Sequence, residues 1–263
     1  MVKIYSKPFT QRNNFLISDV FTSAEKSAII VIELIKNSIR RENMTNSKIS
    51  VKAMAQAAMF TALIFVLAFV PYIGYIRIPV LAIQATTVHI PVIVGSILLG
   101  PKYGGFLGGM FGLTSLINNT MSPGITSFCF SPFVEVGDGV GGSPLALIIC
   151  FVPRILVGVV PYYVYTCIQN RAKEPAKTNK YSLVISGIAG SMTNTILVMS
   201  MIYIFFGHEW ADAKDMAYSK VLGVILSVIA INGTMEAIVA ALITSAVVFA
   251  FIKARLHKPA QKK

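Results

Sequence analysis

The sequence predicts an all-α, polytopic membrane protein, a bundle of six transmembrane helices with both termini in the cytoplasm. Three observations predict this fold. Hydrophobic residues make up 55% of the chain and charged residues only 13%, whereas soluble domains carry about 25% charge. Apolar runs long enough to cross about 30 Å of hydrocarbon recur along the chain. Lys and Arg cluster in the termini and in alternate connecting segments, as the positive-inside rule describes.

Six apolar segments are expected to span the bilayer, at residues 52–72, 80–99, 103–119, 144–168, 182–206 and 220–252. With this arrangement, 19 of the 23 Lys and Arg residues fall on the cytoplasmic side. The outer loops keep Arg77, Lys214 and Lys220, and Arg154 falls within the fourth span. The net charge of +12 therefore indicates topology and contact with anionic lipid. It does not indicate nucleic-acid binding, because the basic residues are scattered and no aromatic residues are interleaved with them.

The chain divides into three parts along its length. Residues 1–43 are polar and of mixed charge, and their one apolar stretch is too short to span and lacks the cleavage pattern of a secretory signal. Met44 opens a segment typical of the start of a membrane protein, so we interpret residues 1–43 as an upstream cytoplasmic extension. A genuine cytoplasmic surface helix is the alternative. Residues 44–257 form the six-helix membrane domain, and residues 258–263 form a basic cytoplasmic tail.

The third span carries two rows of glycines with a spacing of four residues. Gly104, Gly108 and Gly112 form one row, and Gly105 and Gly109 form the other. An interior Gly costs a soluble helix up to about 1 kcal/mol relative to Ala. In lipid, by contrast, small residues at this spacing let two helices approach closely. We therefore expect the third span to pack tightly against its neighbours.

The sequence patterns of common catalytic and metal sites are absent. There is no G-x-x-x-x-G-K-[ST] phosphate loop, no H-E-x-x-H zinc motif and no G-x-S-x-G nucleophile elbow. The cysteines, Cys129, Cys150 and Cys167, show neither a disulfide framework nor metal-ligand spacing. The chain is therefore predicted to bind rather than to catalyse, with no catalytic residue, metal or cofactor of its own.

Polar side chains at bilayer depth are costly and count as candidate functional residues. They are Asn118 and Asn119 at the outer end of the third span, Arg154 in the fourth, Asn194 in the fifth, and Asn232 and Glu236 one turn apart in the sixth. All fall in the outer half or the middle of the membrane, so a pocket open to the outside could collect them. A guanidinium suits a carboxylate, and amides suit hydroxyl and amide groups.

Structural roles for these residues stay open as alternatives. Arg154 and Glu236 could pair with each other and hold the fourth and sixth spans together. Asn194 and Asn232 could form hydrogen bonds between helices instead of binding a ligand. We interpret His89 as a packing or capping residue.

Two outer loops are candidate covers for such a pocket. Residues 120–143 hold three phenylalanines, Phe128 among them, together with several glycines and prolines. Loops of this length are usually lids, binding loops or disordered, and the aromatic residues favour a lid. The loop at residues 72–79, which carries Arg77, is the second candidate.

Taken together, these residues resemble the substrate-binding S components of energy-coupling factor (ECF) vitamin transporters. The resemblance covers about residues 45–255. Ala58 and Ala62 in AAMFTALIF fit the Ala-x-x-x-Ala motif of the first helix in that family. A more specific match is VHIPVIVGSILLGPKYGGFLGGMFGLTSLINNTMSP, followed by TSFCFSP and VPRILVG. It looks most like the pantothenate-type members.

The resemblance implies that the protein captures a vitamin, best matched by pantothenate, outside the bacterial plasma membrane. It would then dock through Ala58 and Ala62 on a transmembrane coupling protein with two cytoplasmic ATPases, and topple to release its cargo inward. The implied partners are the vitamin, this coupling module and the lipid bilayer, with no nucleic acid. The substrate-binding residues expected on this reading are Arg154, Asn118, Asn119, Asn194, Asn232, Glu236, Phe128 and Arg77.

Two other classes of function stay open. An autonomous proton-coupled carrier of a small metabolite would use Glu236 and His89 as a relay. An intramembrane enzyme, or an assembly subunit with no small ligand, is the other class.

Overall fold

The computed structural model describes residues 51–70, 74–78, 83–136, 140–171 and 180–256. The predicted extension at 1–43 and the predicted tail at 258–263 lie outside these residues. The described part is helical apart from two short antiparallel hairpins. One hairpin pairs β1 (Tyr75–Ile78) with β2 (Ile83–Thr86), and the other pairs β3 (Glu135–Val136) with β4 (Val140–Gly141).

The α-helices are α2 (Val51–Phe69), α3 (His89–Leu99), α4 (Pro101–Met121), α5 (Leu145–Arg171), α6 (Lys180–Ala213), α7 (Tyr218–Val228) and α8 (Thr234–Leu256). A 3₁₀ turn, η2 (Ser127–Cys129), lies in the loop after α4, and a π-helical segment, η3 (Ile229–Gly233), joins α7 to α8. In the described part of the chain, four helical segments are long and apolar enough to cross a membrane, at Val51–Phe69, Leu145–Arg171, Lys180–Ala213 and Tyr218–Lys253. The predicted count of six spans and the orientation of the termini stay predictions.

The second predicted span, at 80–99, is wrong in its first part, because residues 83–86 form strand β2. Helix α3 begins only at His89 and has 11 residues, which corresponds to about 16 Å. Pro91 explains the late start, since its missing N–H is tolerated in the first turn of a helix but not in the interior. All residues of α3 from His89 to Ile97 are buried, which accounts for a helix that is apolar on every side.

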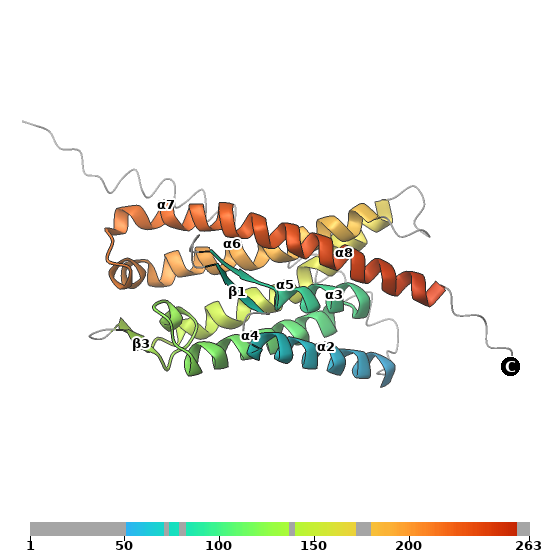
Figure 1. The fold of residues 1–263 in the computed structure, drawn as a ribbon, viewed down its shortest axis with the longest axis horizontal. Coiled ribbons are helices and arrows are strands. Elements are labelled where there is room, and N and C mark those ends of the chain that lie inside the picture. Colours follow the sequence, from blue (N-terminus) through green and yellow to red (C-terminus); the bar gives the residue numbers. More distant parts are fainter. Residues whose placement is uncertain (1–50, 71–73, 79–82, 137–139, 172–179, 257–263) are drawn as a thin grey trace, which may run out of the picture. The chain divides into compact units, whose positions relative to one another are not determined.

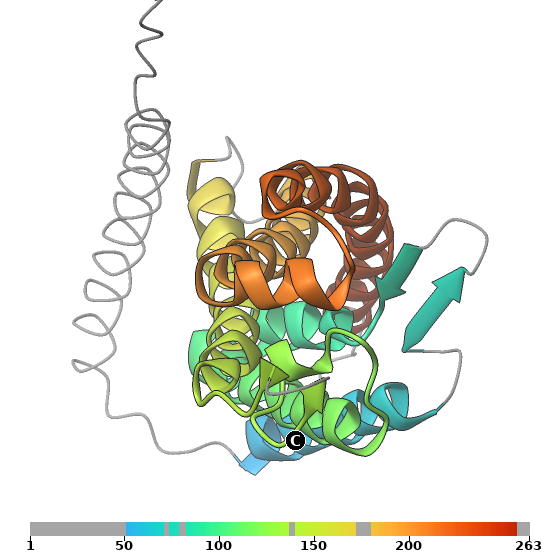
Figure 2. The ribbon, with the colours of Figure 1, turned by 90° about the vertical axis from the view of Figure 1, so that its left-hand side faces the viewer.

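The helices pack in sequence around this short central element. Helix α4 lies along α5, α5 along α6, and α6 along α8, while α3 contacts α2, α4, α5 and α8. Helices α7 and α8 follow each other along one side of the bundle, beside α6 (Figure 1). The hairpin β1–β2 lies at the edge of the bundle next to α8 (Figure 2).

The expected close packing of the glycine-rich helix is confirmed for one of its two rows. A Cβ atom added at Gly104 would overlap the carbonyl oxygen of Gly158, and one at Gly108 would overlap that of Arg154. At Gly109, by contrast, nothing lies within 4 Å of an added Cβ. The first row therefore brings the backbones of α4 and α5 together, and it does so next to Arg154.

Two irregularities interrupt the long helices. Helix α6 is kinked at Phe206, whose φ of −132° and ψ of 21° are not helical. The predicted fifth span ended at residue 206, whereas the helix continues past the kink to Ala213. The second irregularity is the π segment η3, which contains Asn232. Such π segments occur frequently at functional sites.

Candidate ligand-binding site

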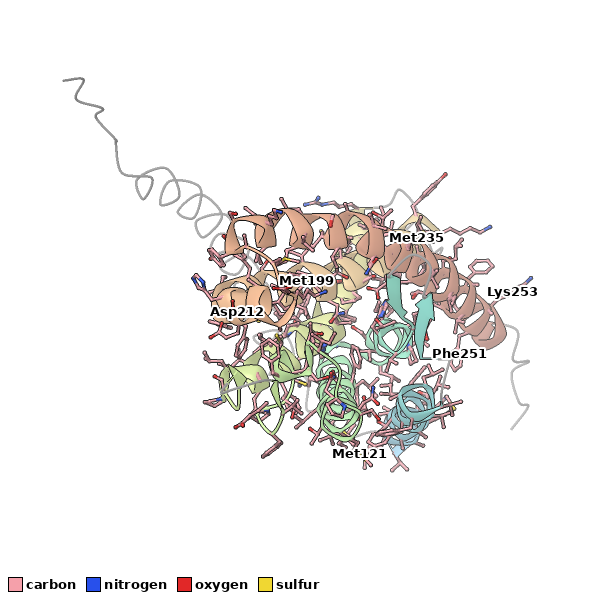
Figure 3. All side chains as sticks on the ribbon, turned by 60° about the vertical axis from the view of Figure 1, so that its left-hand side comes forward. Met121, Met199, Asp212, Met235, Phe251 and Lys253 are labelled. Carbon is pink, nitrogen blue, oxygen red and sulfur yellow. The ribbon has the colours of Figure 1, made fainter. Side chains whose placement is uncertain are left out.

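A cavity of about 280 Å³ lies between the helices where α6 is kinked and where η3 interrupts the α7–α8 segment. Its volume is just below the range that is usual for small-molecule sites, which is about 300–1,000 Å³. Six of the eight residues predicted to bind substrate line it, namely Asn118, Asn119, Arg154, Asn194, Asn232 and Glu236. The structure thus brings together polar residues from four different predicted spans. Met199 of α6, labelled in Figure 3, also lines the cavity.

Arg154 is held in the cavity wall by an interaction with its own helix, α5. The preceding residue, Pro153, lies inside α5 and has no N–H, so it cannot donate to the carbonyl four residues earlier. That carbonyl belongs to Ile149, and it accepts a hydrogen bond of 2.7 Å from Nη1 of Arg154. The guanidinium carbon lies 5.6 Å from the ring centroid of Phe111 and 5.0 Å from that of Phe130. The buried cation thus lies within reach of two aromatic rings, and cation–π attraction stabilises it.

Glu236 is buried at the start of α8 and accepts hydrogen bonds from two other elements. Its Oε1 accepts from the backbone N of Thr86 at 2.7 Å and from Oγ1 of Thr86 at 3.0 Å, and its Oε2 accepts from Oγ1 of Thr195 at 3.1 Å. Arg154 and Glu236 therefore each have hydrogen-bond partners of their own. Whether they also pair with each other stays a prediction.

The four asparagines differ in how fully the protein satisfies their amide groups. Asn119 donates from Nδ2 to the carbonyl of Ser115 at 2.8 Å and accepts from Oγ of Ser127 at 2.8 Å. It thereby ties the loop that contains η2 to the end of α4. Asn194 is 9% exposed, and its Oδ1 has no hydrogen-bond partner among the described residues. Asn118 and Asn232 are half-buried in the cavity wall.

The remaining two predicted site residues are Phe128 and Arg77, and only Phe128 has a described side chain. Phe128 is fully buried and is not among the cavity-lining residues, because its ring packs edge-on against Phe206 at 5.8 Å between centroids. Phe130 lines the cavity instead. Arg77 lies in β1 opposite Gln84, and its side chain lies outside what the structure describes, so its role stays a prediction.

The sequence reasoning missed several residues of the cavity wall. Trp210, in α6 beyond the kink, and Lys214, just after the end of α6, both line the cavity, and Nζ of Lys214 lies 4.7 Å from the ring centroid of Trp210. Polar residues at 208, 209 and 212 ended the apolar run and hid this continuation. The single Trp of the chain was the feature of the sequence that could have pointed to this part of the cavity wall. Thr86 and Thr195 were missed because threonines give no sequence signal at bilayer depth.

The predicted docking residues, Ala58 and Ala62, are both exposed on α2. Phe60 and Ile64, on the opposite side of the helix, are buried in the core. The alanine motif therefore faces away from the bundle.

Cys129 and Cys150 are buried, and Cys167 is exposed. Burial raises the pKa of the Cys129 thiol, and Glu209 adds to this shift. Sγ of Cys150 donates to the carbonyl of Gly112 at 3.2 Å. Within the described residues, no group of three or more His, Cys, Asp or Glu side chains could hold a metal ion.

Three comparisons relate this chain to known proteins. Residues 52–248 match the family model of the ECF transporter, substrate-specific component. The pantothenic acid transporter PanT of Lactococcus lactis subsp. cremoris is 40% identical over 173 residues, which cover 66% of this chain and 80% of that protein. The pantothenate transporter PanT of Leuconostoc mesenteroides subsp. mesenteroides is 26% identical over 206 residues, which cover 78% of this chain and 93% of that protein. A crystal structure of the S component for biotin from an ECF-type ABC transporter aligns with a TM-score of 0.42 and 19% identity. The alignment covers 75% of this chain and 90% of that chain.

Proposed function

The chain belongs to the substrate-specific components of ECF transporters, and we propose that its vitamin is pantothenate, captured at the outer face of the membrane. As a member of this family it is a multi-pass protein of the cell membrane and takes part in vitamin uptake. We further propose that it delivers its cargo through a shared coupling protein, and that two cytoplasmic ATPase subunits supply the energy. ATP would then be hydrolysed on those partner chains.

The observation that supports an anionic vitamin best is the position of Arg154. Arg154 is buried and lines the cavity. A guanidinium binds a carboxylate with two parallel hydrogen bonds. Pantothenate has one carboxylate, one amide and two hydroxyl groups. The remaining wall of the cavity, with four asparagines and several Ser and Thr residues, offers donors and acceptors for those neutral groups.

The names of the two relatives support the choice of vitamin. Both are called pantothenate or pantothenic acid transporters. The chain spans 80% and 93% of their lengths. Riboflavin and folate are the competing substrates within the same architecture.

The coupling partner is proposed to dock on α2. Ala58 and Ala62 are exposed, and short side chains let a partner helix approach closely. In this arrangement both termini lie in the cytoplasm, and the cavity opens toward the outside.

Mass spectrometry of the ligand that co-purifies with the detergent-extracted protein tests the choice of vitamin. We expect pantothenate, and calorimetric titration of the stripped protein should then show pantothenate binding. A carboxamide analogue, which lacks the charge, should bind weakly. Recovery of riboflavin or folate instead would refute pantothenate as the substrate.

A further inference from the structure

The end of strand β2 is attached to helix α8 by a carboxylate. Thr86 is the last residue of β2, and successive N–H groups of a strand point to opposite edges. The N–H of Thr87 donates to the carbonyl of Gly74 at 2.9 Å, on the β1 side of the hairpin. The N–H of Thr86 points the other way and donates to Oε1 of Glu236 at 2.7 Å. Figure 3 shows the hairpin alongside the first turns of α8, where Met235 is labelled.

The protein alone supplies the donors that this buried carboxylate requires. An ionised carboxylate inside a membrane protein needs hydrogen-bond donors to offset its lost hydration. Thr86 provides two donors, its N–H and its hydroxyl, and Thr195 of α6 provides a third. Oγ1 of Thr86 also lies 3.4 Å from Nδ1 of His89 at the start of α3. Glu236 thus joins the hairpin to two long helices, α8 and α6.

We propose that Glu236 is a positioning residue, which holds Thr86 and the end of hairpin β1–β2 in the cavity wall. We call Glu236, Thr86 and Thr195 together the Glu236 latch. Glu236 then affects ligand affinity through the position of Thr86 and not through its own contact with the ligand. The part of this inference that concerns affinity rests on the proposed function, whereas the latch itself does not.

The latch predicts which property of the Glu236 side chain is needed to hold Thr86 in place. It needs an acceptor for Thr86 at the reach of a Glu side chain, and it does not need a negative charge. Glu236→Gln keeps the reach, since its amide oxygen can accept from Thr86 while its NH₂ group faces Thr195. The hydroxyl of Thr195 can then donate to the carbonyl of Ser191, which is 3.3 Å away. Glu236→Asp keeps the charge but is shorter by one methylene, so its carboxylate should not reach Thr86 and the latch should be lost.

Hydrogen–deuterium exchange of the ligand-free protein, resolved to single amides by fragmentation mass spectrometry, tests the latch directly. In Glu236→Ala and Glu236→Asp the Thr86 amide should exchange about tenfold faster or more, given the usual strength of a hydrogen bond to a charged group. In Glu236→Gln it should stay within about threefold of wild type. The Ser122 amide, which donates to the Asn118 carbonyl at 2.9 Å, should not change and serves as the internal control. Unchanged exchange at Thr86 in Glu236→Ala would overturn the latch.

Pantothenate affinity of the same variants tests the second part of the inference. Glu236→Ala and Glu236→Asp should bind about tenfold more weakly or worse, and Glu236→Gln should bind nearly as wild type. Equal loss in Glu236→Gln and Glu236→Ala would mean that the charge itself contacts the ligand, and would overturn the positioning role. If the wild-type protein fails to bind pantothenate, the proposed function fails while the exchange result still stands.

If Glu236→Ala does not fold, Thr195→Val tests the latch in its place. It removes one donor of the latch at almost constant volume, and it should speed exchange at the Thr86 amide severalfold. Thr193→Val is the matched control, because Oγ1 of Thr193 donates at 2.7 Å to the carbonyl of Ala189 in its own helix. Equal exchange rates at Thr86 in the two variants would contradict the latch.

Discussion

Nη1 of Arg154 donates a hydrogen bond of 2.7 Å to the carbonyl oxygen of Ile149, five residues earlier in the same helix. The acceptor is available because Pro153 has no N–H with which to occupy it. The adjacent Pro and Arg therefore act together, since the first exposes a carbonyl and the second uses it to fix its own side chain. On the neighbouring helix, Gly108 lets the backbone of α4 approach this point closely. A buried cation is thus set into the cavity wall with its orientation restricted.

Replacement of Arg154 should weaken pantothenate binding strongly. A hydrogen bond to a charged group contributes about 1.5–3 kcal/mol, so Arg154→Ala should lower the affinity roughly ten- to two-hundredfold. Arg154→Lys should restore only part of this loss, because an ammonium lacks the planar fork. Isothermal titration calorimetry on folded, purified variants measures both effects. If Arg154→Ala binds as tightly as wild type, Arg77 becomes the candidate for the carboxylate.

The alternative ion pair between Arg154 and Glu236 predicts a different pattern of stability. Each single replacement would leave one buried charge unpaired, at a cost of several kcal/mol. The double variant Arg154→Met, Glu236→Met would then recover thermal stability. Thermal unfolding of the two single variants and the double variant separates this pattern from the ligand role, in which Arg154→Ala is folded but binds poorly.

Lys214 should act on the rate of ligand capture. It is exposed, lines the cavity beside Trp210, and carries a charge opposite to that of a carboxylate ligand. Exposed charges at the entrance of a site mainly raise association rates, and salt weakens the effect. Lys214→Gln should therefore slow association severalfold at low ionic strength and change dissociation little. Lys220→Gln is the control, since Lys220 is exposed but does not line the cavity. Stopped-flow tryptophan fluorescence can follow both rates, and a change confined to dissociation would refute the capture role.

The hydrogen bond between Asn119 and Ser127 should slow ligand escape. It ties the loop containing η2 to the end of α4 at 2.8 Å, and both residues line the cavity. Asn119→Ala and Ser127→Ala should each speed dissociation several- to tenfold, as expected for the loss of about 1 kcal/mol. Each replacement removes this shared bond and also a bond of its own, from Asn119 to Ser115 or from Gly124 to Ser127, so the two effects should combine to less than their sum. Additive effects in this double-mutant cycle would contradict a shared tether.

The exposed alanines of α2 should matter for uptake and not for binding. Ala58→Trp and Ala62→Trp should abolish vitamin uptake in cells, because a bulky side chain blocks close contact with a partner helix. Vitamin binding by the isolated protein should stay nearly intact. Leu63→Trp is the control, since Leu63 is also exposed on α2 but lies about 100° further around the helix from Ala62. Normal uptake with normal complex assembly in both alanine variants would remove the docking assignment.

Accumulation of vitamin should require the partner ATPases. Proteoliposomes that hold this protein alone should bind pantothenate without concentrating it, whatever proton gradient is imposed. Adding the coupling protein, the two ATPases and ATP should permit accumulation. Uptake driven by a proton gradient alone would favour an autonomous carrier, in which His89, Thr86 and Glu236 would form the relay.

Much of the candidate site could be predicted because polar residues at bilayer depth are rare. Arg154, Asn194, Asn232 and Glu236 come from three predicted spans, yet depth alone predicted that one cavity could collect them, and they line the same cavity. The choice between Phe128 and Phe130 could not be predicted, since the two rings lie two residues apart in an irregular loop. One packs on Phe206, and the other lines the cavity.

The sequence by itself determined the membrane-protein class and the close approach of the glycine-rich helix. These follow from free energies that depend on residues near one another in sequence, namely burial in hydrocarbon and helix packing at small residues. Only the tertiary structure decided that residues 83–86 form a strand, that α6 continues beyond Phe206 to bring Trp210 over the cavity, and that Glu236 holds Thr86. The last pair is 150 residues apart in sequence, so their contact depends on how the helices rotate and pack against one another.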